Sequence, residues 1–165
     1  MNVWTPFRTC DIANGPGVRV TLFVAGCRIH CKNCFNSECW DFNSGEPFTD
    51  QIRDDILKAL DNHYITGITI LGGEPMEPEN QEGLLPLLTE IRNKFPTKSI
   101  WCYTGYVYDK DLIPGGKRYI EGITNKLLDV IDTLVDGPFV EALKDPNLEF
   151  RGSSNQRILH LKELR

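Results

Sequence analysis

The sequence lacks long apolar runs and blocks of like charge, and each absence excludes a class of protein. No stretch approaches the roughly 18 consecutive apolar residues of a membrane-spanning helix, and the start MNVWTPFRTCDIANG has no secretory signal pattern. The 165 residues carry 18 Lys and Arg against 23 Asp and Glu, a formal net charge of −5. Nucleic acids and anionic membranes favour basic surfaces, so we expect neither as a partner. We expect a cytosolic protein.

The sequence also lacks the paired cysteine motifs that fold around zinc. Its six cysteines include one dense group, Cys27, Cys31 and Cys34 in AGCRIHCKNCFN, and no second pair of this spacing follows downstream. In a reducing cytosol, clustered cysteines more often bind a metal or do chemistry than form disulfides. Three thiols are one fewer than a closed tetrahedral zinc site needs. This pattern therefore indicates a site with one position open to another ligand.

Alternating strand and helix patterns predict an α/β fold. β-branched apolar segments predict strands at 19–26, 65–75, 98–105 and 132–138, with one or two further extended pieces in 148–155 and 156–161. Helical apolar spacing predicts helices at 49–60, 80–95 and 123–132. Thr49 or Asp50 is expected to cap the first helix and Thr124 the third. Pro86 is expected near the first turn of the second helix.

Strands that alternate with helices predict a mostly parallel sheet of right-handed βαβ units. A closed eightfold barrel takes about 250 residues. We therefore expect a single domain over residues 1–165 that forms an open, incomplete barrel or an open twisted sheet.

Four motifs fall at the predicted carboxyl ends of these strands, where ligands bind in such folds. They are CRIHCKNC, GGEP, YTG and VDGP. Their convergence predicts one functional site at this end of the sheet.

The cysteine loop suits an iron–sulfur cluster, because closely spaced thiolates let one loop wrap one cluster. Three thiolates on a four-iron cluster leave one iron for a small-molecule ligand. Gly72 and Gly73 let the backbone approach a ligand closely, and Glu74 provides a carboxylate acceptor beside them.

The C-x₃-C-x₂-C spacing of CRIHCKNC, together with GGEP, resembles that of the radical S-adenosylmethionine enzymes. The resemblance implies an open partial (β/α) barrel and a 4Fe-4S cluster held by the catalytic residues Cys27, Cys31 and Cys34. It implies that S-adenosylmethionine chelates the open iron through its amino and carboxylate groups. Electron transfer from the cluster then splits the sulfonium and yields a 5′-deoxyadenosyl radical.

The resemblance also implies a set of cofactor-binding residues. The set is Asn33, Phe35, Asn36, Gly72, Gly73, Glu74 and Asp136. The family usually has an aromatic residue where this chain has Asn33, so Phe35 or another nearby aromatic residue is expected to supply the ring near the adenine. Asn36 is expected to hold the methionine or ribose part of the cofactor, and Asp136 to lie near it.

Four further segments narrow the resemblance to glycyl-radical activating enzymes of the anaerobic ribonucleoside-triphosphate reductase. They are DIANGPGVR, WCYTGY, LVDGPF and RGSSNQR. This implies that the substrate is a glycine of the large reductase subunit and that flavodoxin or ferredoxin donates the electron. Arg151 and Arg157 are expected to meet the cofactor carboxylate or the partner. An open barrel would admit the glycine loop of a large partner.

Three alternatives stay open. Another glycyl-radical activator, such as the pyruvate formate-lyase type, shares the cysteine spacing and GGEP. A radical enzyme acting on a small molecule is the second. The third is a zinc-stabilised, non-catalytic interaction module with His30, Cys39 or Cys10 as fourth ligand. Cys10 and Cys39 are otherwise expected to be spectators or redox-sensitive thiols, and Cys102 a small buried hydrophobe.

Overall fold

The computed structural model describes residues 1–164; residue 165, the last of the expected domain, lies outside them. Within this range the chain forms one seven-stranded sheet of order β3-β1-β2-β4-β5-β6-β7. The strands are β1 (Asn2–Asp11), β2 (Val18–Val24), β3 (Glu46–Pro47), β4 (Ile65–Gly72), β5 (Ser99–Tyr103), β6 (Thr133–Asp136) and β7 (Arg157–His160). The helices are α1 (Asp50–Leu60), α2 (Pro78–Lys94), α3 (Tyr108–Asp111) and α4 (Thr124–Val130), with 3-10 turns η1 (Ser37–Cys39), η2 (Glu141–Leu143) and η3 (Leu161–Glu163).

The sheet is mixed, so the prediction of a mostly parallel sheet was wrong. The central strands β2, β4, β5 and β6 are parallel to one another, as expected. β1, β3 and β7 pair antiparallel at the two edges. β1 folds back onto β2 through the short turn that precedes Val18, a connection that only antiparallel strands allow. The edge strands of the described sheet do not pair with each other, so it stays open as predicted.

Helices α1, α2 and α4 lie close to the predicted ranges, with two errors in detail, and the short helix α3 was not predicted. Thr49 caps α1 as expected, because its hydroxyl accepts a hydrogen bond from the third helical N–H at 3.3 Å. Pro78, not Pro86, occupies the first turn of α2; Pro86 lies inside that helix. Thr124 is the first residue of α4 rather than its cap, and its hydroxyl donates to Gln81 Oε1 at 2.7 Å. The tertiary partner thus overrides the local capping preference.

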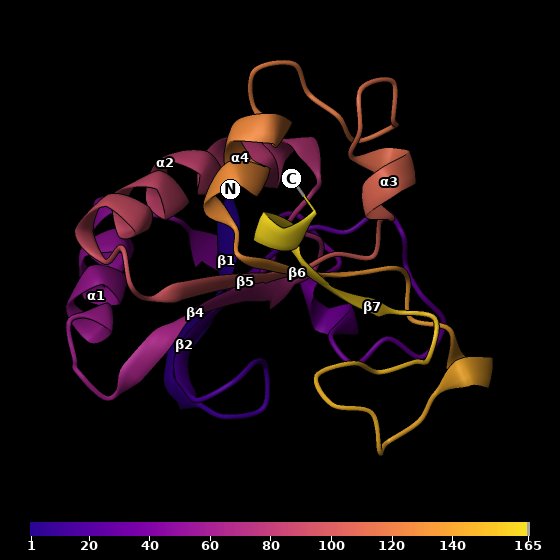
Figure 1. Cartoon of the computed structure of the whole chain (residues 1–165), viewed down its shortest axis with the longest axis horizontal. Helices are drawn as coiled ribbons and strands as arrows, with labels where there is room; N and C mark the ends of the chain where they lie inside the picture. Colours follow the sequence, from indigo (N-terminus) through magenta and orange to yellow (C-terminus); the bar gives the residue numbers. More distant parts are fainter. Residues whose placement is uncertain (165) are drawn as a thin grey trace.

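The segment 148–155 is not extended as predicted. It belongs to a loop between β6 and β7 that contains one isolated bridge, between Lys144 and Ser153. Figure 1 shows this loop and the 11–17 turn on one side of the sheet, with α1, α2 and α4 on the other. One side of the sheet is therefore covered by helices and the other by irregular chain.

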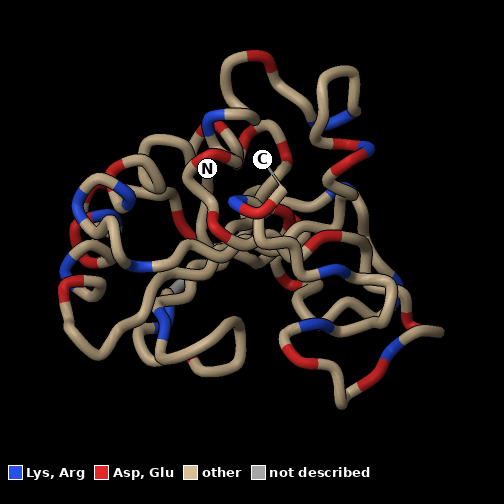
Figure 2. The backbone as a smooth tube through the Cα atoms, viewed as in Figure 1, with Lys and Arg blue, Asp and Glu red and all other residues tan. Residues whose placement is uncertain are grey.

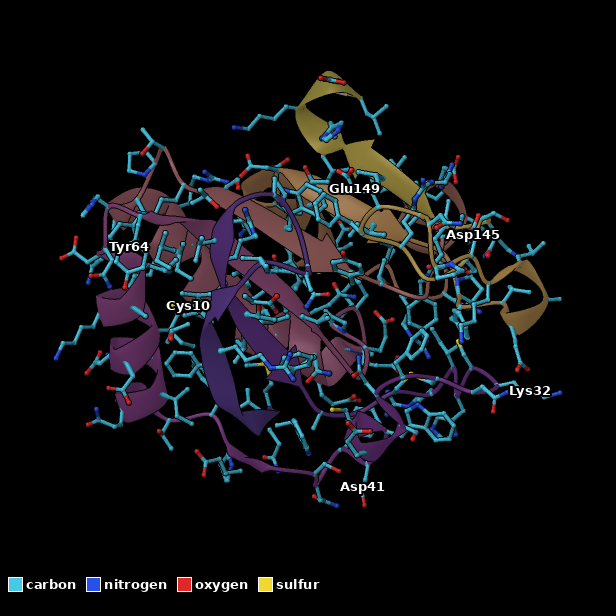
Figure 3. The ribbon with its side chains drawn as sticks, turned by 90° about the horizontal axis from the view of Figure 1, so that it is seen from below. Cys10, Lys32, Asp41, Tyr64, Asp145 and Glu149 are labelled. Carbon is cyan, nitrogen blue, oxygen red and sulfur yellow. The ribbon has the colours of Figure 1, made fainter. Side chains whose placement is uncertain are left out.

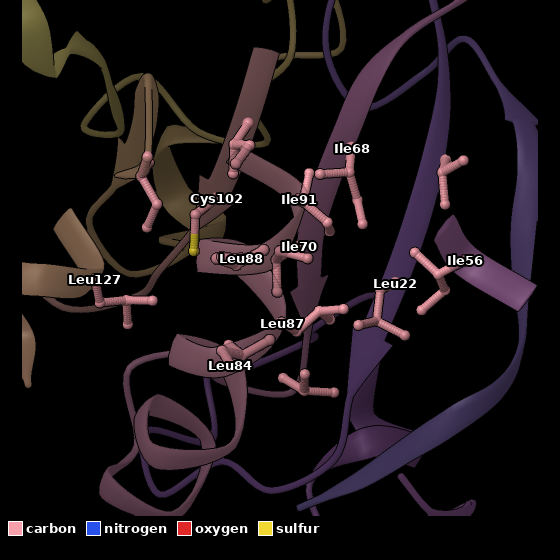
Figure 4. Packing of buried hydrophobic residues seen from close by; sticks show 14 of the residues in the cluster. Leu22, Ile56, Ile68, Ile70, Leu84, Leu87, Leu88, Ile91, Cys102 and Leu127 are labelled. Carbon is pink, nitrogen blue, oxygen red and sulfur yellow. The ribbon is translucent and has the colours of Figure 1, made fainter. Parts of the chain in front are cut away.

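Aliphatic side chains fill the space between the sheet and the helices. Figure 4 shows this core, with Leu22, Ile68 and Ile70 of the sheet packed against residues of α1, α2 and α4. Cys102 lies fully buried among them, which confirms its expected place as a small hydrophobe. Lys and Arg are interspersed with Asp and Glu along the helices and loops (Figure 2). Among the described residues, no helix has the length and apolar character needed to cross a membrane.

The opposite face of the sheet holds a fully buried arginine. Arg19 of β2 is 0% exposed and donates hydrogen bonds to Thr69 Oγ1 at 2.8 Å, to Ile68 O at 2.9 Å and to Ser99 Oγ and O at 2.9 Å. Its guanidinium lies 5.8 Å from the Trp101 ring centroid. Burial lowers the pKa of Arg19 to about 10, which leaves the group charged at neutral pH. One side chain thereby joins β2, β4 and β5.

Arg19→Lys is expected to lower the free energy of unfolding by about 2–3 kcal/mol, because a single ammonium cannot reach these separated acceptors and leaves buried oxygens without donors. Urea unfolding measures the change. Arg53→Lys on the surface of α1 is the matched control and should leave the midpoint unchanged. Equal midpoints for the two variants would contradict the assigned role of Arg19.

Candidate functional site

The carboxyl ends of the parallel strands border a cavity of about 480 Å³. Ligand sites in proteins occupy about 300–1,000 Å³, so this cavity has the size of a cofactor site. The cysteine loop after β2 lines one side, and the segment 137–156 lines the other. These two segments meet where Lys32 Nζ lies 3.9 Å from Glu141, and Figure 3 shows Lys32 and Asp145 on the same side of the molecule.

The cysteine loop is folded so that its three thiols face one space. Cys27, Cys31 and Cys34 are all unpaired and all line the cavity. His30 and Asn33 have φ angles of 53° and 57°, left-handed conformations that reverse the chain between the cysteines. The chain can wrap around a bound group in this way without a longer loop.

The donor set fits a group that binds thiolates. Burial raises the pKa of Cys27 to about 11 and also raises the pKa of Cys31. A bound metal centre replaces such thiol protons, because only the thiolate is a strong ligand. The backbone N–H of Asn36 points at Cys34 Sγ over 3.4 Å, the kind of contact that tunes cluster sulfurs. No group of three or more His, Cys, Asp or Glu side chains in residues 1–164 is arranged to hold a single metal ion.

The turn after β4 lies against the cysteine loop and requires its glycines. Gly72 has a φ of 132°, and a Cβ there would lie 2.3 Å from the carbonyl oxygen of Val24. A Cβ at Gly73 would lie 2.7 Å from the carbonyl oxygen of Gly26. The backbone N–H of Glu74 donates to that same oxygen at 2.7 Å. Backbone contacts therefore fix this turn against the start of the cysteine loop.

Glu74 is a buried carboxylate with three donors. Its side chain accepts hydrogen bonds from Thr104 Oγ1 and Gly105 N, both at 2.6 Å, and from Met76 N at 2.8 Å. Burial raises the pKa of Glu74 to about 7, although the three donors oppose the shift. A carboxylate offers about four acceptor positions, so one position on Oε1 is left for a ligand in the cavity.

Most of the predicted site residues line this cavity. They are Cys27, Cys31, Cys34, Phe35, Asn36, Gly72, Gly73 and Glu74. Phe35 is 64% exposed at the rim, with its ring 5.2 Å from the ring of Phe139. Asn33 and Asp136 are not in the lining. The Asn33 amide donates to Glu141, and the Asp136 carboxylate accepts from the Tyr108 N–H at 2.8 Å.

The structure distinguishes Arg151 from Arg157, two residues for which the sequence predicted the same role. Arg157 is bound to Asp136 through Nε at 2.9 Å and to Asp109 at 3.1 Å. Arg151 lines the cavity, and its buried Nε has no hydrogen-bond partner among the described residues. Of the two, only Arg151 belongs to the cavity lining.

Lining residues such as Arg8 and Phe150 have no local sequence signal, whereas Tyr103 belongs to the YTG motif. Tyr103, Phe150 and Arg8 come from strands and a loop far apart in the chain. Tyr103 donates its hydroxyl to the carbonyl oxygen of Phe150 at 2.7 Å. Only the fold brings these side chains together. Cys10 and Cys39 are not in the lining. Cys10 lies exposed on β1 (Figure 3), and Cys39 is buried.

Comparison with known proteins gives consistent matches over most of the chain. Residues 13–159 match the family described as a 4Fe-4S single cluster domain. The Anaerobic ribonucleoside-triphosphate reductase-activating protein of Escherichia coli (strain K12) is 44% identical over 154 residues, 92% of this chain and 94% of that protein. Proteins of the same name from Vibrio cholerae and Enterobacteria phage T4 are 39% and 36% identical, each over 90% of this chain and over 91% and 88% of their own lengths.

The raised pKa of Glu74 predicts a pH dependence. The folded chain binds this proton more tightly than the unfolded chain, so the contribution of Glu74 to stability is full below about pH 4.5 and falls until about pH 7. Relative to Glu74→Gln, cluster-free protein should lose about 3 kcal/mol of unfolding free energy across this range. Anaerobic urea unfolding at several pH values measures the difference.

Glu79→Gln is the control with the opposite sign. A hydrogen bond from Arg28 lowers the pKa of Glu79, so its contribution to stability grows as pH rises through the acid range. A Glu74 difference that is flat with pH, or that grows with pH as Glu79 does, would contradict the assignment.

Proposed function

Because this chain belongs to the family of anaerobic ribonucleoside-triphosphate reductase-activating proteins and carries a 4Fe-4S single cluster domain, we propose that it generates the glycyl radical of such a reductase by radical S-adenosylmethionine chemistry. The observation that carries the proposal is the meeting of three unpaired thiols with the Gly72, Gly73 and Glu74 turn on one cavity. The open, partly parallel sheet is consistent with a radical S-adenosylmethionine partial barrel.

Cys27, Cys31 and Cys34 would hold the cluster, and the neighbouring lining would hold S-adenosylmethionine on its open iron. When bound, these groups supply reductive cleavage of the sulfonium to methionine and a 5′-deoxyadenosyl radical, which takes a hydrogen atom from glycine. The protein would bind these groups and orient them.

Each lining residue would contact the part of the cofactor that suits its chemistry. Glu74 has one carboxylate position left for the ammonium of the cofactor, and Gly73 lets the backbone come close. Arg151, which lies in the cavity lining, would meet the cofactor carboxylate. Phe35 would stack near the adenine, and Asn36 would hold the methionine or ribose part. Asn33 and Asp136, which lie outside the lining, would shape the site through Glu141 and Arg157.

The partner would be the large subunit of the reductase, with flavodoxin or ferredoxin as electron donor. The sheet edges in the described chain are not joined, which suits entry of a protein loop at this end. The alternative, activation of a pyruvate formate-lyase type enzyme, has less support because the relatives cited above are all named for the reductase.

Replacement of Cys27, Cys31 or Cys34 by Ala is expected to abolish cluster binding and glycyl-radical formation on the large subunit. Cys39→Ala is the matched control: the same substitution in the same segment, at a buried thiol outside the lining, should retain the cluster. The measurement is low-temperature electron paramagnetic resonance of dithionite-reduced protein, with and without S-adenosylmethionine.

A reduced-cluster signal that changes shape on addition of S-adenosylmethionine supports an open iron in the parent protein. A silent parent sample with stoichiometric zinc and no iron would instead support the non-catalytic zinc module. A cofactor-responsive cluster that forms a radical only on a pyruvate formate-lyase type partner would favour that alternative.

A further inference from the structure

A second buried carboxylate follows Glu74 by three residues and has no place in the site described above. Glu77 precedes α2, and its side chain is 0% exposed. It is not in the cavity lining. A buried carboxylate is strongly unfavourable unless hydrogen bonds and opposite charges compensate it, so its partners show what it holds in place.

The partners of Glu77 come from three different segments. Oε2 accepts a hydrogen bond from the backbone N–H of Arg28, in the cysteine loop, at 2.6 Å. Oε1 accepts from the Tyr106 hydroxyl, after β5, and from Arg118 Nε, before α4, each at 2.8 Å. The Arg28 guanidinium lies 3.6 Å from Oε1. The carboxylate therefore joins the loops that follow β2, β4 and β5 and the segment before α4.

We propose that Glu77 is the positioning residue of the cluster loop: it fixes the peptide group that follows Cys27 and so sets where the first thiolate points. The inference rests on the proposed function, because it assigns the loop to a cluster. The Arg28 N–H belongs to the peptide bond that begins at the carbonyl carbon of Cys27. Rotation of that peptide plane would change the backbone ψ of Cys27 and turn its side chain relative to Cys31 and Cys34.

The bond to Arg28 is of the strong kind. An ionised acceptor makes a backbone hydrogen bond shorter and about twice as strong as a neutral pair, and 2.6 Å is short for such a bond. Burial keeps water from competing for the carboxylate. The carboxylate also lies close to the first proposed cluster ligand, because Oε2 is hydrogen-bonded at 2.6 Å to the peptide group that adjoins Cys27. Removal of this charge should make the cluster easier to reduce.

Glu77→Gln is the test variant and Glu79→Gln the matched control. Both remove one negative charge from the start of α2, and both carboxylates contact Arg28. Glu79, however, bonds only its guanidinium, at 3.0 Å, and its side chain is 46% exposed. The difference between the variants therefore isolates the buried bond to the backbone of the cysteine loop.

The first measurement is amide hydrogen exchange by NMR on the cluster-free full chain. Glu77→Gln should speed exchange of the Arg28 amide by roughly tenfold or more, since a hydrogen bond to a charged group is weakened. The effect should be confined to the cysteine loop and to the Tyr106 and Arg118 segments. Glu79→Gln should exchange like the parent.

The second measurement is iron content and cluster midpoint potential after anaerobic reconstitution. Glu77→Gln should bind less iron per chain, and its residual cluster should have a less negative potential than those of the parent and Glu79→Gln. Equal exchange and equal potential for the two variants would overturn the proposal. So would exchange that is faster throughout the chain with an unchanged potential, because that result describes general destabilisation.

A parent chain that takes up no iron would overturn the proposed function and, with it, the role of Glu77 toward a cluster. The exchange measurement does not use the cluster, so it still decides whether Glu77 holds the loop. The two failures are therefore distinguishable.

Discussion

Two buried carboxylates, placed by the turn after β4, hold together the irregular loops at the carboxyl edge of the sheet. Loops at this edge have backbone N–H groups that make no hydrogen bonds between strands. Where such N–H groups are buried, they need other acceptors. Glu74 accepts from Gly105 N and Thr104, and Glu77 accepts from Arg28 N and Tyr106. Without these acceptors, buried backbone donors of the cysteine loop and of the β5 loop would lose their partners, which would weaken the walls of the cavity between them.

Much of this arrangement could be predicted from local sequence, because the central strands and the site motifs are local signals. Continuous β-branched runs marked β2 and β4, and the cysteine spacing and the glycine pair marked their ends. β1 was missed because NVWTPFRTCD contains a proline and little alternation; it is extended because it pairs with β2. Because the prediction did not include β1 and its antiparallel pairing, it gave a sheet with a larger share of parallel strands than the structure has.

The parts of the site that could not be predicted depend on long-range contacts. Glu77 reaches Arg28 across 49 residues, and Tyr103 reaches Phe150 across 47. Contacts between residues so far apart produce no local pattern in the sequence. Asp136 stood at a predicted strand end like Glu74, yet its carboxylate turns to Arg157 instead of the cavity. A strand-end position therefore predicts the neighbourhood of a side chain and leaves its direction undetermined.

The buried guanidinium of Arg19 has a consequence for the order in which the chain can fold. Its acceptors on Thr69, Ile68 and Ser99 lie 50, 49 and 80 residues away, so the chain must close long loops before the charge is satisfied. In an intermediate with β2 and β4 but without β5, the Arg19 guanidinium would either be buried with too few acceptors or leave its face of the sheet exposed to water. We expect such a half-formed sheet to be unstable. Strands β2, β4 and β5 should then form together in a single cooperative step.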